Sequence, residues 1–315
     1  MQLYKSRDFS AFFQDTFSFL KQNGKHFFKH FFIINGIFIL ILMVFGYFFT
    51  KLYSQFIFGA LSTNSGPNII EDYLNENGLL FFLIGFLFLV AALISAVISY
   101  SYTPIYLKLF VEKGNRDFST QEIIAVYKQK IGNILLFLLI SIFVAILLLI
   151  PVGILSAVLV ITIVGILFLP LVIGGFALFF GCSLMEYLEG KKGLQESYSY
   201  SWKLISSKFW AAVGSVGLFY FMSYIVQNII TLIPYFFGMV SFFTTIEQQG
   251  QPEAEEVSSF ITFMMLLVFF LSFLLGTVLN NIVQLNQGIV FYSLKEENEN
   301  VNTKNEIDLI GSSEQ

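Results

Sequence analysis

Long apolar runs separated by short polar breaks make up most of the sequence. We assign six of these runs as membrane spans, at about 27–52, 79–103, 131–152, 158–186, 209–234 and 259–292. A helix needs about 20 predominantly apolar residues to cross a bilayer, and each run is at least that long. We therefore predict an all-α polytopic membrane protein with six transmembrane helices.

The third and fourth spans come from one uncharged stretch between Ile131 and Met185. This stretch is more than twice the length that a single span needs. We therefore predict two spans joined by a tight reversal. Pro151 and Gly153 are the strongest turn-forming residues in its middle and place the reversal within 151–160.

Three polar segments, at about 7–22, 118–130 and 192–207, each precede a pair of spans. Large apolar side chains recur at helical spacing along the third segment, at Leu194, Tyr198, Trp202, Ile205 and Phe209. A helix with one aromatic face and basic residues off that face is typical of a helix lying in a membrane interface. We predict three such interfacial amphipathic helices, and Ser119 with Glu122 has the spacing of a capping box at the start of the second.

The third segment and the start of the fifth span supply the expected membrane-interface anchors. These are Trp202, Lys203, Phe209 and Trp210, whose aromatic rings and positive charge suit the depth of lipid headgroups.

The same plan recurs along the chain. Residues 7–10 and 116–119 share the sequence Arg-Asp-Phe-Ser, and an interfacial segment precedes each pair of spans. We predict three parallel repeats within a single transmembrane domain, 1–294. Turn-rich residues at 60–78 and acidic residues at 246–258 predict outer loops, and 295–315 predicts a disordered acidic cytoplasmic tail.

The basic residues define an orientation. If the N-terminus is cytoplasmic, Lys51 is the only one of the 17 basic residues that lies outside. The positive-inside rule then predicts that both termini are cytoplasmic. The basic side suits an anionic inner leaflet, so we expect the lipid bilayer as a partner and expect no nucleic acid. Only 12% of the residues are charged, against about 25% in soluble domains, which agrees with a membrane protein.

Few residues offer catalytic or metal-binding chemistry. No Asp, Glu, Lys, Arg or His lies deep within a predicted span, and Cys182 is the only cysteine. His26 and His30 have a spacing that suits a metal, but no carboxylate stands beside them, and we expect them at the headgroups. We predict no enzymatic activity, no cofactor and no metal site.

Uncharged polar residues gather in the inner half of the spans. The hypothesis that they favour is a polar cavity open to the cytoplasm, lined by Asn35, Ser183, Glu186, Asn280, Asn281, Gln284 and Gln287. The alternative is hydrogen bonding between helices, worth about 0.6 kcal/mol per contact on average.

Residues 196–210 resemble an inner loop found in a group of bacterial six-span membrane proteins. The matching positions are Ser201, Trp202, Lys203, Phe209 and Trp210. That group includes the membrane domain ahead of the catalytic domain in some glycerophosphodiester phosphodiesterases. The resemblance implies a six-span fold in a bacterial inner membrane. We expect no phosphodiesterase activity, because only the acidic tail follows the last span.

These patterns favour a non-enzymatic membrane scaffold or partner subunit, bound to another membrane protein or to further copies of itself. The alternative is an uncoupled transporter or lipid-handling protein that uses the amide-lined cavity. A membrane enzyme is the least favoured class, because no catalytic constellation is present in the sequence.

Overall fold

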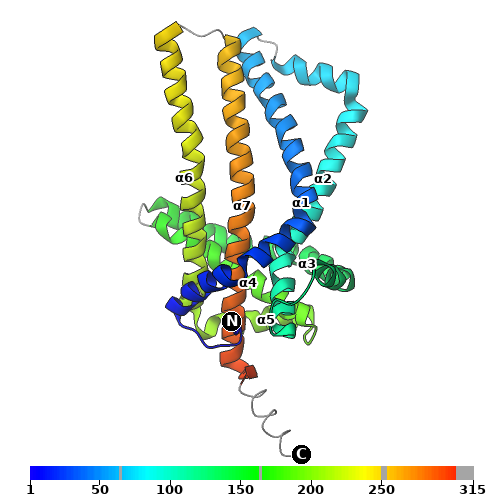
Figure 1. Cartoon of the computed structure of the whole chain (residues 1–315), viewed down its shortest axis with the longest axis vertical. Helices are drawn as coiled ribbons and strands as arrows, with labels where there is room; N and C mark the ends of the chain where they lie inside the picture. Colours follow the sequence, from blue (N-terminus) through cyan, green and yellow to red (C-terminus); the bar gives the residue numbers. More distant parts are fainter. Residues whose placement is uncertain (64–65, 163–164, 250–253, 303–315) are drawn as a thin grey trace, which may run out of the picture. The chain divides into compact units, whose positions relative to one another are not determined.

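The computed structural model describes residues 1–63, 66–162, 165–249 and 254–302. Within these ranges the chain forms helices and no strand (Figure 1): α1 (Phe9–Thr63), α2 (Gly66–Lys113), α3 (Thr120–Ile161), the short 3-10 helix η1 (Gly165–Phe168), α4 (Leu169–Glu189), α5 (Leu194–Ser207), α6 (Phe209–Gln249) and α7 (Ala254–Glu299). Six helical segments are long and apolar enough to cross a membrane. The prediction of an all-helical, multi-pass membrane protein is confirmed at this level.

The helices extend well beyond the predicted spans. Residues 60–78 and 246–258 were predicted as loops, but α2 already begins at Gly66, α6 continues to Gln249 and α7 begins at Ala254. The predicted loops are therefore too long. Extending an existing helix costs much less than nucleating one, so a few Gly or Asn residues do not end it.

The reversal between the third and fourth spans comes later than predicted. Pro151 lies inside α3, which continues to Ile161 and is capped by Thr162, and α4 starts at Leu169. The predicted reversal within 151–160 is therefore wrong. A proline inside a helix removes only one backbone hydrogen bond, and such a proline is tolerated in membrane helices.

The start of α3 agrees with the sequence. Ser119 accepts a hydrogen bond from the Glu122 backbone N–H at 3.4 Å, and the Glu122 carboxylate accepts one from the Ser119 N–H at 2.8 Å. This confirms the predicted capping box. Most of 118–130 and most of 7–22 are the opening turns of α3 and α1, whereas most of 192–207 forms the separate helix α5. The placement of these three segments in a membrane interface stays a prediction, and so does the three-fold repeat.

The C-terminal end of α7 differs from the predicted tail. The helix passes through Lys295 and ends at Glu299, so the prediction of disorder from residue 295 is wrong at its beginning. Lys295 is 1% exposed. The rest of that tail, residues 303–315, lies outside the described residues.

The chain divides into two compact units. Unit 1 comprises Met1–Ile34, Val97–Ser223 and Leu279–Gln315, and unit 2 comprises Asn35–Ala96 and Tyr224–Val278. Unit 1 has a dense aromatic core, in which the Phe27 ring lies 5.1 Å from that of Tyr102 and 4.9 Å from that of Tyr106. Unit 2 consists of stretches of α1, α2, α6 and α7. Most of the described large apolar side chains in its α2 and α6 stretches are exposed, as expected for a surface that faces lipid.

Two glycines let α4 and α6 approach closely within unit 1. A Cβ atom added to Gly174 would lie 2.6 Å from the Gly217 backbone nitrogen. A Cβ atom added to Gly217 would lie 2.9 Å from the Leu171 Cα atom. Small residues at such crossings are common between membrane helices.

Candidate functional site

The most deeply buried charges in unit 1 lie where α4 and α7 end. Glu186 is fully buried, and its two carboxylate oxygens accept hydrogen bonds from Lys192 at 2.5 Å and from Lys295 at 2.7 Å. Lys295 also donates to the Glu189 carboxylate at 2.6 Å. A buried charge without a partner is strongly destabilising, so this pairing is what allows Lys295 and Glu186 to be buried.

The turn between α4 and α5 brings Lys192 back to Glu186. Gly190 adopts the left-handed conformation, with φ of 79°, and ends α4. The Lys192 ammonium then lies 3.8 Å from the centre of the Tyr200 ring, and Tyr200 donates a hydrogen bond to Glu299 at the end of α7. Burial, followed by the neighbouring carboxylates, raises the pKa of Tyr200, so the phenol stays protonated and remains a donor. We call Glu186, Glu189, Lys192, Lys295 and Glu299 the ion cluster.

Hydrogen bonds hold the N-terminal segment beside the ion cluster. The buried Arg7 guanidinium donates hydrogen bonds to three backbone carbonyls, those of Gln2, Leu3 and Lys5, and to the Asp15 carboxylate at 2.7 Å. Ser6 donates to Glu297 of α7 at 2.7 Å. Tyr4 donates to Glu189 at 3.5 Å, and burial raises the pKa of its phenol. Tyr4 and Ser6 therefore link the N-terminal segment to the ends of α4 and α7, while Arg7 holds that segment in shape.

The residues predicted to line a polar cavity are mostly buried. Asn35, Ser183, Glu186, Asn281, Gln284 and Gln287 are buried, whereas Asn280 is exposed. Ser183 donates to the Phe179 carbonyl of its own helix, and Glu186 belongs to the ion cluster. Gln287 packs so closely on α4 that a Cβ atom at Gly181 would lie 2.5 Å from its Oε1 atom. Of these residues, Glu186 pairs with Lys295 of another helix and Gln287 packs closely on α4, while the polar cavity stays a prediction.

Asn286 forms hydrogen bonds between helices, although it was not among the residues predicted to line the polar cavity. Its side chain donates to Thr16 of α1 at 3.0 Å and pairs with Ser215 of α6 at 3.1–3.2 Å. All three residues are buried. The signal in the sequence was the run of amides along α7, but the partners lie far away in the chain.

His26 and His30 belong to a hydrogen-bonded chain that joins α1, α2 and the start of α3. His26 Nδ1 lies 2.8 Å from the Tyr106 hydroxyl, and its Nε2 lies 3.2 Å from the Phe118 carbonyl oxygen and 3.0 Å from His30 Nε2. His30 Nδ1 lies 2.6 Å from the Thr120 hydroxyl. A carbonyl only accepts, so His26 Nε2 carries the proton and Tyr106 donates to Nδ1. In the described part of the chain, no third acid, histidine or cysteine completes a metal site here.

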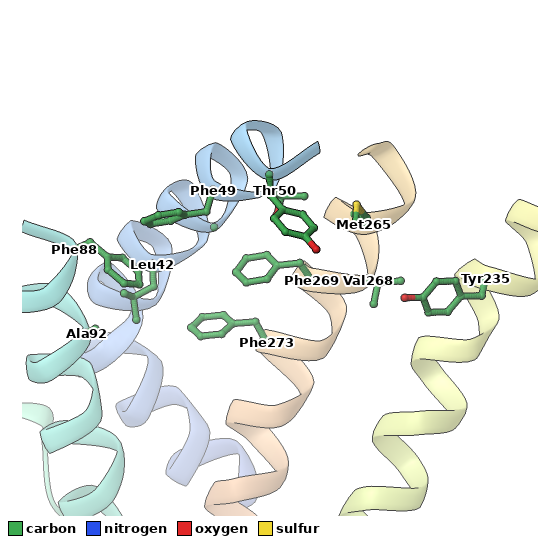
Figure 2. A pocket seen from close by; sticks show the side chains of 12 residues that line it. Leu42, Phe49, Thr50, Phe88, Ala92, Tyr235, Met265, Val268, Phe269 and Phe273 are labelled. Atoms are coloured by element: carbon green, nitrogen blue, oxygen red, sulfur yellow. The ribbon is translucent and has the colours of Figure 1, made fainter. Parts of the chain in front are cut away.

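A cleft of about 700 Å³ lies within unit 2 and is lined by all four of its helices. Its wall is aromatic: Phe269 and Phe273 project from α7 toward the side where Phe88 of α2 and Phe49 of α1 lie (Figure 2). The Phe88 ring centre lies 5.4 Å from that of Phe49. The lining includes no charged side chain, and its polar side chains are Thr50, Tyr53 and Tyr235. We call this space the unit 2 cleft.

A second apolar space of about 850 Å³ lies within unit 1, between α3, α4, α5 and the start of α6. Of the predicted interface anchors, Trp202, Phe209 and Trp210 line it, and all three are exposed. Lys203 follows Trp202 on α5 and is also exposed. The structure therefore brings three of the four predicted anchors together at one space, which we call the unit 1 groove.

No known protein family, characterised protein or solved structure matches this chain. The relation of residues 196–210 to the membrane domains of glycerophosphodiester phosphodiesterases stays a prediction.

Proposed function

We propose that this chain is a non-enzymatic multi-pass membrane protein that binds and handles lipids or similar apolar molecules. The observation that carries this proposal is the unit 2 cleft. Its volume of about 700 Å³ lies within the range of about 300–1,000 Å³ that is usual for ligand pockets. Its aromatic lining offers dispersion contacts and excludes water, which suits an acyl chain.

The lining favours an apolar ligand over a polar solute. A polar solute would lose its hydration in a cleft whose walls offer three hydroxyl groups and no charge. The buried amides that would serve a polar solute lie in other parts of the chain and do not line this cleft. The proposal therefore keeps the lipid-handling alternative from the sequence but moves it from an amide-lined cavity to an aromatic cleft.

We further propose that the protein lies in a bacterial inner membrane with both termini in the cytoplasm. The support is the distribution of basic residues, of which only Lys51 falls on the other side. In this orientation the ion cluster and α5 belong to the cytoplasmic side, where anionic lipids meet basic residues.

Photo-crosslinking tests the proposed lipid binding. The purified protein in detergent would receive a trace of phospholipid carrying a diazirine on its acyl chain, and labelled peptides would be mapped by mass spectrometry. We expect saturable labelling at cleft residues such as Phe88 and Phe269, lost when excess unlabelled phospholipid competes. The Val268→Phe variant fills the cleft and should reduce this labelling several-fold.

Leu271→Phe is the matched control, because Leu271 is an exposed apolar residue of α7 that does not line the cleft. It should label like the unsubstituted protein. Equal labelling of the cleft and of exposed residues such as Leu274, unchanged by Val268→Phe, would overturn the proposal.

A membrane scaffold is the second candidate, and the ion cluster favours it. Hydrogen bonds and ion pairs fasten the N-terminal segment, the end of α4, α5 and the end of α7 to one another, which suits a rigid surface for a partner. Crosslinking before affinity purification separates the two candidates. A stoichiometric protein partner without bound lipid would favour the scaffold over lipid handling.

A further inference from the structure

The unit 1 groove is shaped to hold an acyl chain. Its lining includes Leu148 and Val152 of α3, Val172 and Phe176 of α4, and Ile205 of α5, and almost all of it is apolar. An extended peptide segment would bring unpaired backbone polar groups into this space, whereas an acyl chain has none. The lining therefore fits a lipid better than an extended protein segment.

One wall of the groove is held in place by its own contacts. The Tyr198 hydroxyl lies 2.6 Å from that of Ser141, which fixes α5 to α3. The Tyr198 ring also stacks on Phe137 and Phe179, with ring centres 5.5 and 5.6 Å away. Because this wall is formed before any ligand arrives, binding costs little ordering of side chains.

The groove is bordered by groups that suit a charged headgroup. Trp202, Trp210 and Ser199 line it, and tryptophan is enriched at the depth of lipid headgroups. Lys203 lies next to Trp202 in the sequence and one helical turn after Ser199. Lys203 is exposed and has no ion-pair partner within the described ranges. A positive charge one helical turn from Ser199, at the edge of the groove, complements a negative headgroup.

We propose that the unit 1 groove binds one anionic phospholipid of the surrounding bilayer, with an acyl chain in the groove and the headgroup beside Lys203. This site is separate from the unit 2 cleft, and the proposal does not depend on lipid handling there. The lipid would act as a bound ligand that spans α3, α4, α5 and α6.

The two tryptophans of the chain make the groove directly measurable. Trp202 and Trp210 are the only two in the sequence, and both line the groove. Their fluorescence would be recorded for the full chain in detergent micelles during titration with phospholipids brominated on an acyl chain. We expect saturable quenching, with phosphatidylglycerol acting at about fivefold lower concentration than phosphatidylcholine, since one nearby lysine contributes roughly that factor.

Two matched pairs of variants locate the lipid. Leu155→Phe narrows the groove and should weaken quenching several-fold, whereas Ile154→Phe, at an exposed neighbour outside the lining, should not. Lys203→Gln should abolish the preference for phosphatidylglycerol, whereas Lys191→Gln, at another exposed lysine near the start of α5, should keep it.

Four results would overturn the proposal. Quenching that rises in proportion to the concentration of either lipid, without saturation, would mean that the tryptophans merely contact bulk lipid. Equal quenching in the Leu155→Phe and Ile154→Phe variants would show that the lipid does not occupy the groove. An equal lipid preference in the Lys203→Gln and Lys191→Gln variants would show that Lys203 does not bind the headgroup. Tryptophans that are shielded from all brominated lipid in a dimer would assign the groove to a second copy of the chain. Because the unit 2 cleft contains no tryptophan, none of these results bears on lipid binding there.

Discussion

Replacing Lys295 with methionine is expected to lower the free energy of unfolding by about 3–5 kcal/mol. Lys295 is almost fully buried and is paired with two carboxylates, those of Glu186 and Glu189. Without its ammonium, Glu186 keeps only Lys192, and Glu189 has no ion-pair partner in the described ranges. Methionine preserves much of the apolar stem, so the loss reports on charge rather than on packing.

Unfolding in detergent, followed by a spectroscopic signal, measures this loss. Lys191→Met is the control, because Lys191 is exposed and its replacement should change the free energy of unfolding by no more than about 0.5 kcal/mol. A second variant tests the cause. Adding Glu189→Gln to Lys295→Met removes one of the carboxylates left unpaired and should recover part of the free energy of unfolding. Equal stability of Lys295→Met and Lys191→Met would show that the ion cluster does not hold unit 1 together.

Replacing Gly217 with alanine should lower the free energy of unfolding by about 1–3 kcal/mol. The new Cβ atom would lie 2.9 Å from the Leu171 Cα atom and 3.0 Å from the Pro170 carbonyl oxygen. Those are backbone atoms, so α4 and α6 must move apart to relieve the contact. The separation would also loosen a boundary of the unit 1 groove, which Leu171 lines.

Gly153→Ala is the matched control for this prediction. Gly153 also lies within a helix, α3, but a Cβ atom there meets nothing within 4 Å. That variant should be neutral or more stable by up to about 1 kcal/mol, because alanine is the better helix former. The same unfolding measurement applies to both variants. A Gly217→Ala protein as stable as Gly153→Ala would mean that the two helices are not in close contact.

Local features of the fold could be predicted from the sequence, because their causes are local. The capping box needs only Ser119 and Glu122 in the right spacing, and six long apolar runs need only length and composition. Helix ends were predicted less well. Pro151 was expected to mark a reversal, but a single proline removes only one backbone hydrogen bond and is tolerated within α3.

Features that depend on tertiary contacts could not be predicted. Glu186 and Lys295 are 109 residues apart in the sequence, and nothing near Lys295 shows that its charge will be neutralised. A lysine among several acids was therefore expected to begin a disordered tail. The amides of α7 were recognised, but the Thr16 and Ser215 partners of Asn286 come from two other helices. The sequence indicated the unit 1 groove only through its tryptophans, because the walls of the groove come from separate helices.

The arrangement of the six spans across the membrane underlies both lipid proposals, and one measurement tests it directly. Single cysteines at Ser62, Ser199 and Glu255 would be treated in intact cells with a membrane-impermeant maleimide. The single native thiol, Cys182, is buried and gives little background. We predict labelling of Ser62→Cys and Glu255→Cys in intact cells, and of Ser199→Cys only after permeabilisation. Labelling of Ser199→Cys in intact cells, with the other two protected, would contradict the account.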